Sequence, residues 1–292
     1  MLGQQLVNGV LLGATYALFA LGFTLIFGVL RVINLLYGFY FTAGAYLALG
    51  LAQAGFGIWT ALPIAAVGAG LIAVVLDLAL LTPLRRARAP ELASLMVTLG
   101  AALALTASAS LLFSTDIRRL PPDIISFQAI VVGGVRVTIT QLLILLASVV
   151  IVAALVALMR GTRLGLAIRA MAERPDAAAL MGIDTLRTAA IVSFLSGTLA
   201  GAGGVLIGLN FNAIQPYMGE NMMLRGFVVV IVGGLGDITG ALVAGLGLGI
   251  IEVLTAGYID SSLKDAVGFL ILFAVLWTRP SGLFGRSAAR RA

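Results

Sequence analysis

Long apolar segments alternate with shorter polar segments along the whole chain. Several of the apolar segments reach the roughly 20 residues that a helix needs to cross a bilayer. Their apolar residues are continuous, whereas the strands of a membrane β-barrel alternate between apolar and polar positions. The pattern predicts an all-α fold, a polytopic transmembrane helical bundle with eight or nine membrane segments in one domain, residues 1–292. The segments are 6–30, 35–51, 58–81, 92–113, 141–159, 188–209, 222–232, 239–256 and 263–278.

Two of these segments differ from ordinary membrane spans. Residues 35–51 are rich in glycine and uneven in hydropathy, and residues 222–232 are short and end at a glycine-rich break. Broken helices are tolerated in a membrane only where they face protein or a water-filled cavity. We therefore expect both segments to be short or re-entrant and to lie in the interior of the bundle.

The Lys and Arg residues predict how the bundle is oriented. If all nine segments cross, 13 of the 18 basic residues lie on one face and 4 on the other, with Arg225 at a boundary. The more basic face of a membrane protein is normally cytoplasmic. This rule predicts an outside N-terminus, a cytoplasmic C-terminus, a cytoplasmic loop at 160–187 and a periplasmic loop at 114–140. The first face carries Arg31, Arg85, Arg86, Arg88, Arg160, Arg163, Arg169, Arg174, Arg187, Arg279, Arg286, Arg290 and Arg291, and the second carries Arg118, Arg119, Arg136 and Lys264.

Composition narrows the possible functions. Hydrophobic residues make up 61% of the chain and charged residues 10%, which would leave large apolar patches on a soluble protein. The chain has no cysteine and no histidine, so thiolate chemistry and imidazole bases are excluded, and its acidic residues are scattered. These features argue against an intramembrane enzyme. The basic residues lie between apolar segments without interleaved aromatic residues, which argues against nucleic-acid binding. No basic stretch precedes the first apolar segment, which predicts a retained helix and not a cleaved signal peptide.

The 160–187 loop contains a predicted short helix. Pro175 can open a helix because its missing N–H costs nothing in the first turn, and Asp176 there suits the helix dipole. Gly182 can close the helix in the left-handed conformation. Two interpretations are open: a helix that docks into a groove of a soluble partner, or an ordinary structured loop. The candidate docking residues are Arg174, Pro175, Asp176, Ala177, Ala178, Leu180, Met181 and Gly182.

Glycines recur at four-residue spacing, which lets two membrane helices approach closely. Tight packing inside one subunit and a contact between subunits both explain the pattern, and we favour the first. The pairs are Gly9 and Gly13, Gly197 and Gly201, Gly204 and Gly208, Gly236 and Gly240, and Gly245 and Gly249.

Acidic residues inside membrane segments are costly, so each is a functional candidate. Asp77 lies near the predicted cytoplasmic end of its segment, where a local ion pair with Arg31 or Arg85 is the favoured explanation. Glu252 lies toward the outer end of its segment, where it is either solvated or paired with Lys264.

Two further polar residues have two interpretations each. Arg225 opens a short segment and either meets a carboxylate on a solute or binding protein, or extends outward to water. Asn34 lies between the first two segments, and it either ties down a broken backbone, which we favour, or touches solute.

Four motifs in sequence order support a family resemblance. They are VIN at 32–34 followed by Gly38 and GAY at 44–46, the loop GLAIRAMAERPDAAALMGID at 165–184, the glycine-rich IVGGLGDITGALVAG at 231–245, and RPSGLFG at 279–285. With these motifs the chain resembles the branched-chain amino-acid permeases of ABC importers, the LivH/LivM-type family, and in particular its LivH-like subunits. The family usually has a histidine before the glycine at 38. Here Tyr37 changes the size and polarity of that position and so bears on which solute is carried.

The resemblance implies a mechanism and a set of partners. A periplasmic solute-binding protein would deliver a branched-chain or related amino acid, and a second homologous permease would form the other half of the path. Urea, short amides and small aromatic acids are alternative solutes within the family. Two cytosolic ATPase subunits would bind ATP and Mg and act on the 160–187 loop, in a bacterial inner (cytoplasmic) membrane. The path would include Asn34, Tyr37, Gly38, Gly44, Tyr46, Gly233, Gly234 and Gly236.

The chain itself has no G-x-x-x-x-G-K-[ST] phosphate loop. We therefore expect it to bind no cofactor and no metal. An ion-coupled secondary transporter would need carboxylates near the membrane midplane and often shows an internal repeat. Neither is evident in the sequence, so this alternative is disfavoured.

Overall fold

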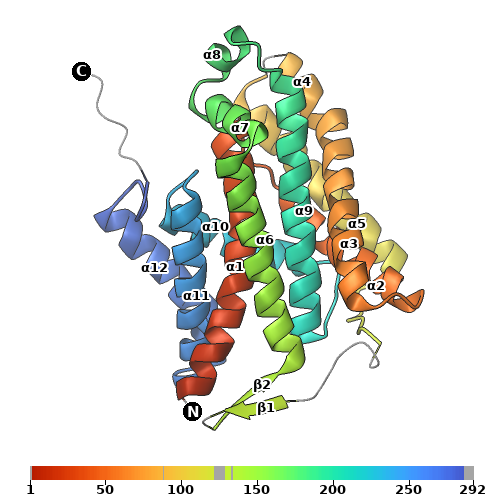
Figure 1. Cartoon of the computed structure of the whole chain (residues 1–292), viewed down its shortest axis with the longest axis vertical. Helices are drawn as coiled ribbons and strands as arrows, with labels where there is room; N and C mark the ends of the chain where they lie inside the picture. Colours follow the sequence, from red (N-terminus) through yellow and green to blue (C-terminus); the bar gives the residue numbers. More distant parts are fainter. Residues whose placement is uncertain (1, 88, 122–128, 133, 286–292) are drawn as a thin grey trace.

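The structure of the chain is a computed structural model. Long helices run between the two ends of the molecule (Figure 1). The structure describes residues 2–87, 89–121, 129–132 and 134–285. Arg88, Arg286, Arg290 and Arg291 of the predicted cytoplasmic set, and residues 122–128 of the predicted periplasmic loop, lie outside the described residues. The helices are α1 (Leu2–Leu30), α2 (Leu36–Gln53), α3 (Ile58–Leu76), a π-helix (Asp77–Leu81), α4 (Thr82–Arg86), α5 (Glu91–Phe113), α6 (Ile139–Gly161), α7 (Arg163–Glu173), α8 (Pro175–Leu180), α9 (Thr185–Phe211), α10 (Met218–Gly233), α11 (Ile238–Tyr258), a 3-10 turn (Ser261–Leu263) and α12 (Lys264–Thr278).

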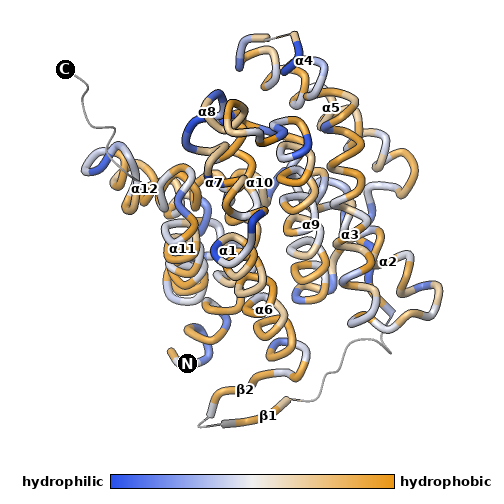
Figure 2. Tube along the Cα trace, turned by 45° about the horizontal axis from the view of Figure 1, so that its top comes forward, coloured by the Kyte–Doolittle hydropathy of each residue, from blue (hydrophilic) through white to orange (hydrophobic). Residues whose placement is uncertain are grey.

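Within the described residues, seven helical stretches are long and apolar enough to cross a membrane. The remaining two predicted segments are α2 and α10, which are the ones expected to be short or re-entrant. In α10 the helix begins at Met218, four residues before the predicted start. Figure 2 shows apolar residues along the helices and polar residues mainly at their ends and in the connections.

The loop at 114–140 contains a short hairpin that the all-α prediction missed. Strand β1 (Ala129–Val132) pairs antiparallel with β2 (Val135–Thr138), and Gly134 lies in the turn with a φ of 82°. Both strands are rich in β-branched residues, which favour extended backbone. Thr138 then caps α6 by accepting a hydrogen bond from the Gln141 amide at 3.2 Å. The hairpin therefore leads directly into a membrane-length helix.

Helix α1 forms the centre of the bundle, and 89% of its most apolar stretch is buried. It packs along α11, where a Cβ added at Gly13 would lie 2.7 Å from the Leu246 Cα, and Gly245 and Gly249 face back toward α1. Gly201 packs in the same way against Ala69 of α3. The small residues at four-residue spacing therefore serve close helix packing within this chain, the interpretation that the sequence favoured.

The π-helix holds a buried carboxylate. Asp77 is 1% exposed, forms an ion pair with Arg85, and accepts a hydrogen bond from the Ser193 hydroxyl at 2.9 Å. The predicted local ion pair is confirmed, and its partner is Arg85. Arg31, the other predicted partner, donates instead to backbone carbonyls of α7.

The outer helices leave broad apolar surfaces uncovered. Only 17% of the most apolar stretch of α5, 22% of that of α6 and 6% of that of α12 are buried. A soluble protein does not tolerate apolar faces of this extent. These helices therefore face lipid or another membrane-embedded chain.

Candidate functional site

The chain folds back into the bundle between α1 and α2. Arg31 ends α1 with a left-handed backbone, φ 53°, and Asn34 follows with 1% of its surface exposed. The Asn34 side-chain oxygen accepts a hydrogen bond from the Leu36 amide at 3.0 Å, which satisfies one free donor at the start of α2. Asn34 thus ties down a broken backbone, as its favoured interpretation predicted.

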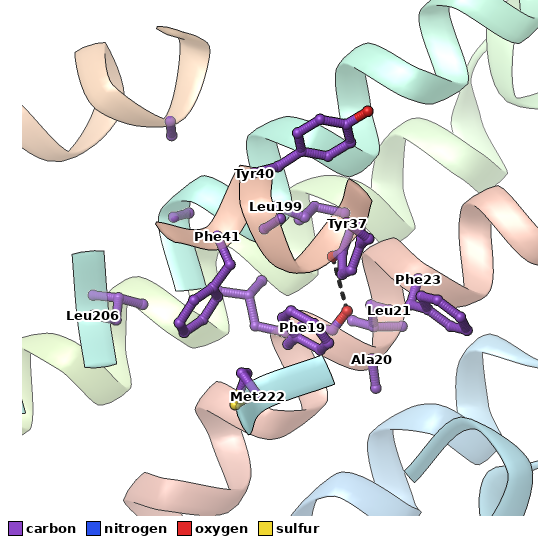
Figure 3. Packing of buried hydrophobic residues seen from close by; sticks show 14 of the residues in the cluster. Phe19, Ala20, Leu21, Phe23, Tyr37, Tyr40, Phe41, Leu199, Leu206 and Met222 are labelled. Atoms are coloured by element: carbon purple, nitrogen blue, oxygen red, sulfur yellow. Dashed lines mark hydrogen bonds between the residues drawn. The ribbon is translucent and has the colours of Figure 1, made fainter. Parts of the chain in front are cut away.

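Helix α2 begins at the depth of the middle of α1. The Tyr37 hydroxyl donates to the Phe19 carbonyl at 2.9 Å (Figure 3). Phe19 lies 11 residues before the end of α1, which corresponds to about 16 Å of helix. The Tyr37 ring packs edge-on against Phe19 and Phe23, with ring centres 4.6 and 5.7 Å away. Tyr37 is therefore buried against α1, and Gly22 leaves the room for its hydroxyl.

Helix α10 also begins inside the bundle, where it meets α2. The Gly219 amide donates to the Thr42 hydroxyl at 3.1 Å. A Cβ added at Gly38 would lie 2.8 Å from the Gly219 carbonyl oxygen. Farther along α10, Gly226 packs against the Phe19 ring. The two short helices thus contact one another in the interior, around the same aromatic side chain of α1.

The glycine-rich break after α10 contacts the C-terminal motif. Gly234 has a φ of 109° and packs against Gly282 and Gly285. The Leu283 amide donates to the Val232 carbonyl at 2.8 Å, and the Phe284 amide donates to Gly233 at 3.1 Å. The structure therefore joins the 231–245 and 279–285 motifs, which are far apart in the sequence.

The predicted path residues do not form one cluster. Asn34, Tyr37 and Gly38 lie around the start of α2, whereas Gly233, Gly234 and Gly236 lie at the break, where Gly236 faces Gly28 at the end of α1. Gly44 contacts Gly201 of α9, and the Tyr46 ring stacks on Phe113 with centres 4.5 Å apart. In this chain most of these residues serve contacts between elements.

The short helix predicted in the 160–187 loop is present as α8, at the end of the molecule farthest from the N-terminus (Figure 1). It begins at Pro175, and Gly182 follows it with a φ of 86°. Ala178 is buried, whereas Leu180 is 90% and Met181 is 84% exposed. Helix α8 therefore presents two large apolar side chains that nothing in the described chain covers.

Helix α7 connects this end to the broken segment. Arg31 donates hydrogen bonds to the carbonyls of Ala172 and Glu173, both at 3.1 Å. A cavity of about 660 Å³ opens beside these residues, and Glu91, Arg169 and Gly236 also line it. The last residues of α1, the break after α10 and the helix preceding α8 therefore meet around one cavity.

The sequence did not predict that a set of charged and polar side chains would form a cluster. Glu252 is 3% exposed and accepts a hydrogen bond from the Tyr16 hydroxyl at 2.7 Å. Its ion-pair partner is Arg225, at 3.7 Å, and not Lys264 as the sequence had suggested. Arg225 also donates to Asp265 at 2.8 Å. Arg225 and Glu252 were separate candidates in the sequence. No sequence pattern indicates that four different helices bring Arg225, Glu252, Tyr16 and Asp265 together.

Comparison with known proteins decides the family. A model of the permease component of branched-chain amino acid transport systems matches residues 5–276. The chain belongs to this family. It is 32% identical to the high-affinity branched-chain amino acid transport system permease protein LivH of Salmonella typhimurium, over 97% of this chain and 95% of the relative. LivH of Escherichia coli K12 gives the same values, and BraD of Pseudomonas aeruginosa is 30% identical over equal shares. No solved structure matches the chain.

Family membership and the apolar helices agree. A chain of this family with seven membrane-length helices in its described part is a multi-pass membrane protein and a permease component of an ABC transporter. The family model covers residues 5–276, so it includes α8, the broken segment before α2 and the glycine-rich segment after α10. The LivH-like resemblance predicted from four short motifs is thereby confirmed.

Proposed function

We propose that this chain is the transmembrane permease subunit of a bacterial ABC importer for branched-chain or related amino acids. It forms half of the translocation path, and a second homologous permease forms the other half. LivH and BraD are named as branched-chain amino acid permeases, and each matches this chain over nearly its whole length. Their names support the proposed solute class. The uncovered apolar face of α12 supports a membrane-embedded neighbour.

The exposed helix α8 is the observation that carries the proposed drive mechanism. Leu180, the last residue of α8, and Met181, which follows it, are almost fully exposed at one end of the bundle. Exposed apolar side chains presented on a helix are a common means of binding in an apolar groove of a partner. The 160–187 loop is cytoplasmic in this proposal, and α8 couples the permease to two cytosolic ATPase subunits. These subunits bind ATP and Mg, and a periplasmic binding protein delivers the solute on the other side.

The proposed path follows the two short helices. Helices that start inside a bundle bring backbone polar groups to membrane depth, which is favourable only beside a cavity or protein. Helices α2 and α10 meet there at Gly38 and Gly219, and the break at Gly233, Gly234 and Gly236 continues toward the α8 end. These glycines set the spacing of the helices that form the path, and movement of α8 reaches them through α7 and Arg31.

The test is to place charges on α8 in the assembled transporter. The double variant Leu180→Asp, Met181→Asp should lose copurification of the ATPase subunits and at least tenfold of L-leucine uptake, because carboxylates cannot enter an apolar groove unpaired. The amount of permease in the membrane should not change, since both side chains are exposed. Ala87→Asp, on another exposed turn at the same end, is the control and should behave as wild type. Normal ATPase association and uptake in the double variant would refute the coupling role of α8.

A further inference from the structure

Tyr16, Arg225, Glu252 and Asp265 form a polar cluster that extends from the buried Tyr16 and Glu252 to the exposed Asp265. They come from α1, α10, α11 and α12, respectively. The Tyr16 hydroxyl donates to Glu252 Oε2 at 2.7 Å, and Arg225 Nη2 donates to Asp265 Oδ1 at 2.8 Å. The Arg225 guanidinium also lies 5.9 Å from the centre of the Tyr16 ring. Ionisable side chains at membrane depth are costly and normally mark a solute or ion pathway.

The cluster is not a closed set of ion pairs. Glu252 Oε1 lies 3.7 Å from Arg225 Nε, a distance too long for a hydrogen bond. Arg225 has five N–H donors, and its contacts with Asp265 use only Nε and Nη2. Asp265 is more than half exposed, so it holds Arg225 from the outer side of the cluster. A buried acceptor and a guanidinium with spare donors therefore stand near each other without a direct hydrogen bond.

Three cavities border Arg225. One of about 360 Å³ includes Tyr16, Glu252 and the polar side chains of Asn8 and Gln141. The other two have volumes of about 230 and 290 Å³. Small-molecule sites are typically about 300–1,000 Å³, mostly apolar, with a few convergent polar groups. The cavity of about 360 Å³ falls within this range, and the two smaller cavities border the same guanidinium and combine apolar residues with a few polar groups.

The apolar residues that line this space come from three helices, α10, α11 and α12. The cavity of about 230 Å³ is lined by Arg225, Glu252 and Asp265 together with several apolar residues. Its large apolar residues are Leu224, Val228, Leu248 and Phe269. A ligand with a charged head and a branched aliphatic tail would find a partner for each part within one cavity.

We propose that this cluster binds the zwitterionic head of an α-amino acid during its passage through the permease. The α-carboxylate pairs with Arg225, whose planar fork matches a carboxylate and takes the place of Asp265. The α-ammonium pairs with Glu252, whose second oxygen is held by Tyr16. The aliphatic side chain lies along Val228, Leu248 and Phe269. The identity of the solute class rests on the proposed function, but the position of the site does not.

A buried ion network with only a structural role is the competing explanation. Such a network would keep its members paired at all times and would not respond to solute. The chain has no natural cysteine, so a single introduced thiol is the one labelling site on this subunit. Asn221 is exposed and lines two of the three cavities, and Ile259 is exposed and lines none of them. The variants Asn221→Cys and Ile259→Cys therefore form a matched pair.

The first measurement is thiol labelling in the purified full transporter. L-Leucine should slow labelling of Asn221→Cys severalfold and leave Ile259→Cys unchanged. Isopentylamine is leucine without the carboxylate and 4-methylpentanoate is leucine without the ammonium, so neither should protect. Protection by all three compounds would indicate an apolar cavity without zwitterion recognition, and protection by none would show that the cluster does not bind the solute. Either result overturns the proposal.

The second measurement is L-leucine uptake by the assembled transporter. Arg225→Gln and Glu252→Gln should each lower uptake at least tenfold, and Arg225→Lys should lose less because it keeps the charge. Arg136→Gln removes an exposed cation outside the cluster and should match wild type. If wild type takes up leucine and the two glutamine variants do so equally well, the site assignment fails alone. If wild type itself takes up no leucine, the proposed solute class fails. Labelling of Asn221→Cys in the presence of the three probes still tests the site in that case.

Discussion

Glycine residues determine how closely the helices of this permease approach one another. A Cβ added at Gly44 would overlap the backbone of Gly201 on α9, whereas a Cβ at Gly50, two turns farther along α2, meets nothing within 4 Å. The same residue type in one helix therefore serves packing at one position and not at the other. The sequence shows both glycines alike, and only the neighbouring helix distinguishes them.

Gly44→Ala should lower the stability of the permease, and Gly50→Ala should not. The added methyl group at position 44 has to push two backbones apart, and overpacking of this kind costs about 1–3 kcal/mol. At position 50 alanine should be neutral or stabilise the helix by about 0.5–1 kcal/mol. Thermal unfolding of the two variants in the same detergent measures the difference. Equal melting temperatures would show that α2 and α9 separate without cost.

Charged residues illustrate which contacts a sequence can predict. The Asp77–Arg85 pair could be predicted because its partners are eight residues apart on one continuous helical stretch. The cluster around Arg225 could not, because Tyr16 and Glu252 are separated by 236 positions. Local spacing indicates local partners, whereas a long-range cluster depends on how α1, α10 and α11 pack.

At the scale of elements, helix limits followed from local chemistry. Pro175 and Gly182 predicted α8 because proline fits the first turn and glycine adopts a positive φ. The hairpin at 129–138 was not predicted, because its valines are equally compatible with an irregular loop and its two strands are only four residues each. The sequence predicted that α2 and α10 differ from ordinary membrane spans, but their contact at Gly38 and Gly219 depends on the backbone of both.

Arg31 links two of these elements and should matter for coupling. It joins the broken segment before α2 to α7 through two backbone carbonyls. Hydrogen bonds from charged groups contribute about 1.5–3 kcal/mol, less when exposed, so Arg31→Ala should loosen this link without unfolding the protein. We expect severalfold lower leucine uptake, and ATP hydrolysis that no longer rises when solute-loaded binding protein is added.

The control for this experiment is Arg160→Ala. Arg160 is exposed at the end of α6 and belongs to the same basic face. Its loss should leave uptake and stimulated hydrolysis unchanged. If Arg31→Ala behaves like Arg160→Ala, the connection between α7 and the broken segment does not transmit movement.

At the scale of the whole molecule, the basic residues separate toward two ends. Those of α4 and α7 gather at one end, where Arg31 also lies (Figure 1). Arg136 lies at the other end, where its backbone amide donates to Gln4 at the start of α1. Counting the basic residues of successive loops predicted such a division, because each membrane crossing places the next loop on the opposite face. Which end faces the cytosol is still a prediction.

Cysteine labelling in intact cells should determine this orientation. With no natural cysteine in the chain, Ala177→Cys on α8 and Ile117→Cys near the opposite end each provide one thiol. A membrane-impermeant maleimide should label Ile117→Cys from outside and should reach Ala177→Cys only after the cells are opened. Labelling of Ala177→Cys in intact cells would reverse the assignment.

The central position of α1 has a consequence for how the protein is made. A chain is synthesised from its N-terminus, so this deeply buried helix enters the membrane before the helices that cover it. Its main partner, α11, begins at Ile238, and the glycine faces of the two helices cannot meet until most of the chain has been translated. During that interval α1 has to remain in lipid or be held by the insertion machinery with Tyr16 and its glycine face uncovered. Biogenesis of this permease therefore depends on protecting its first helix, and a truncated chain that ends before α11 should be degraded in the cell.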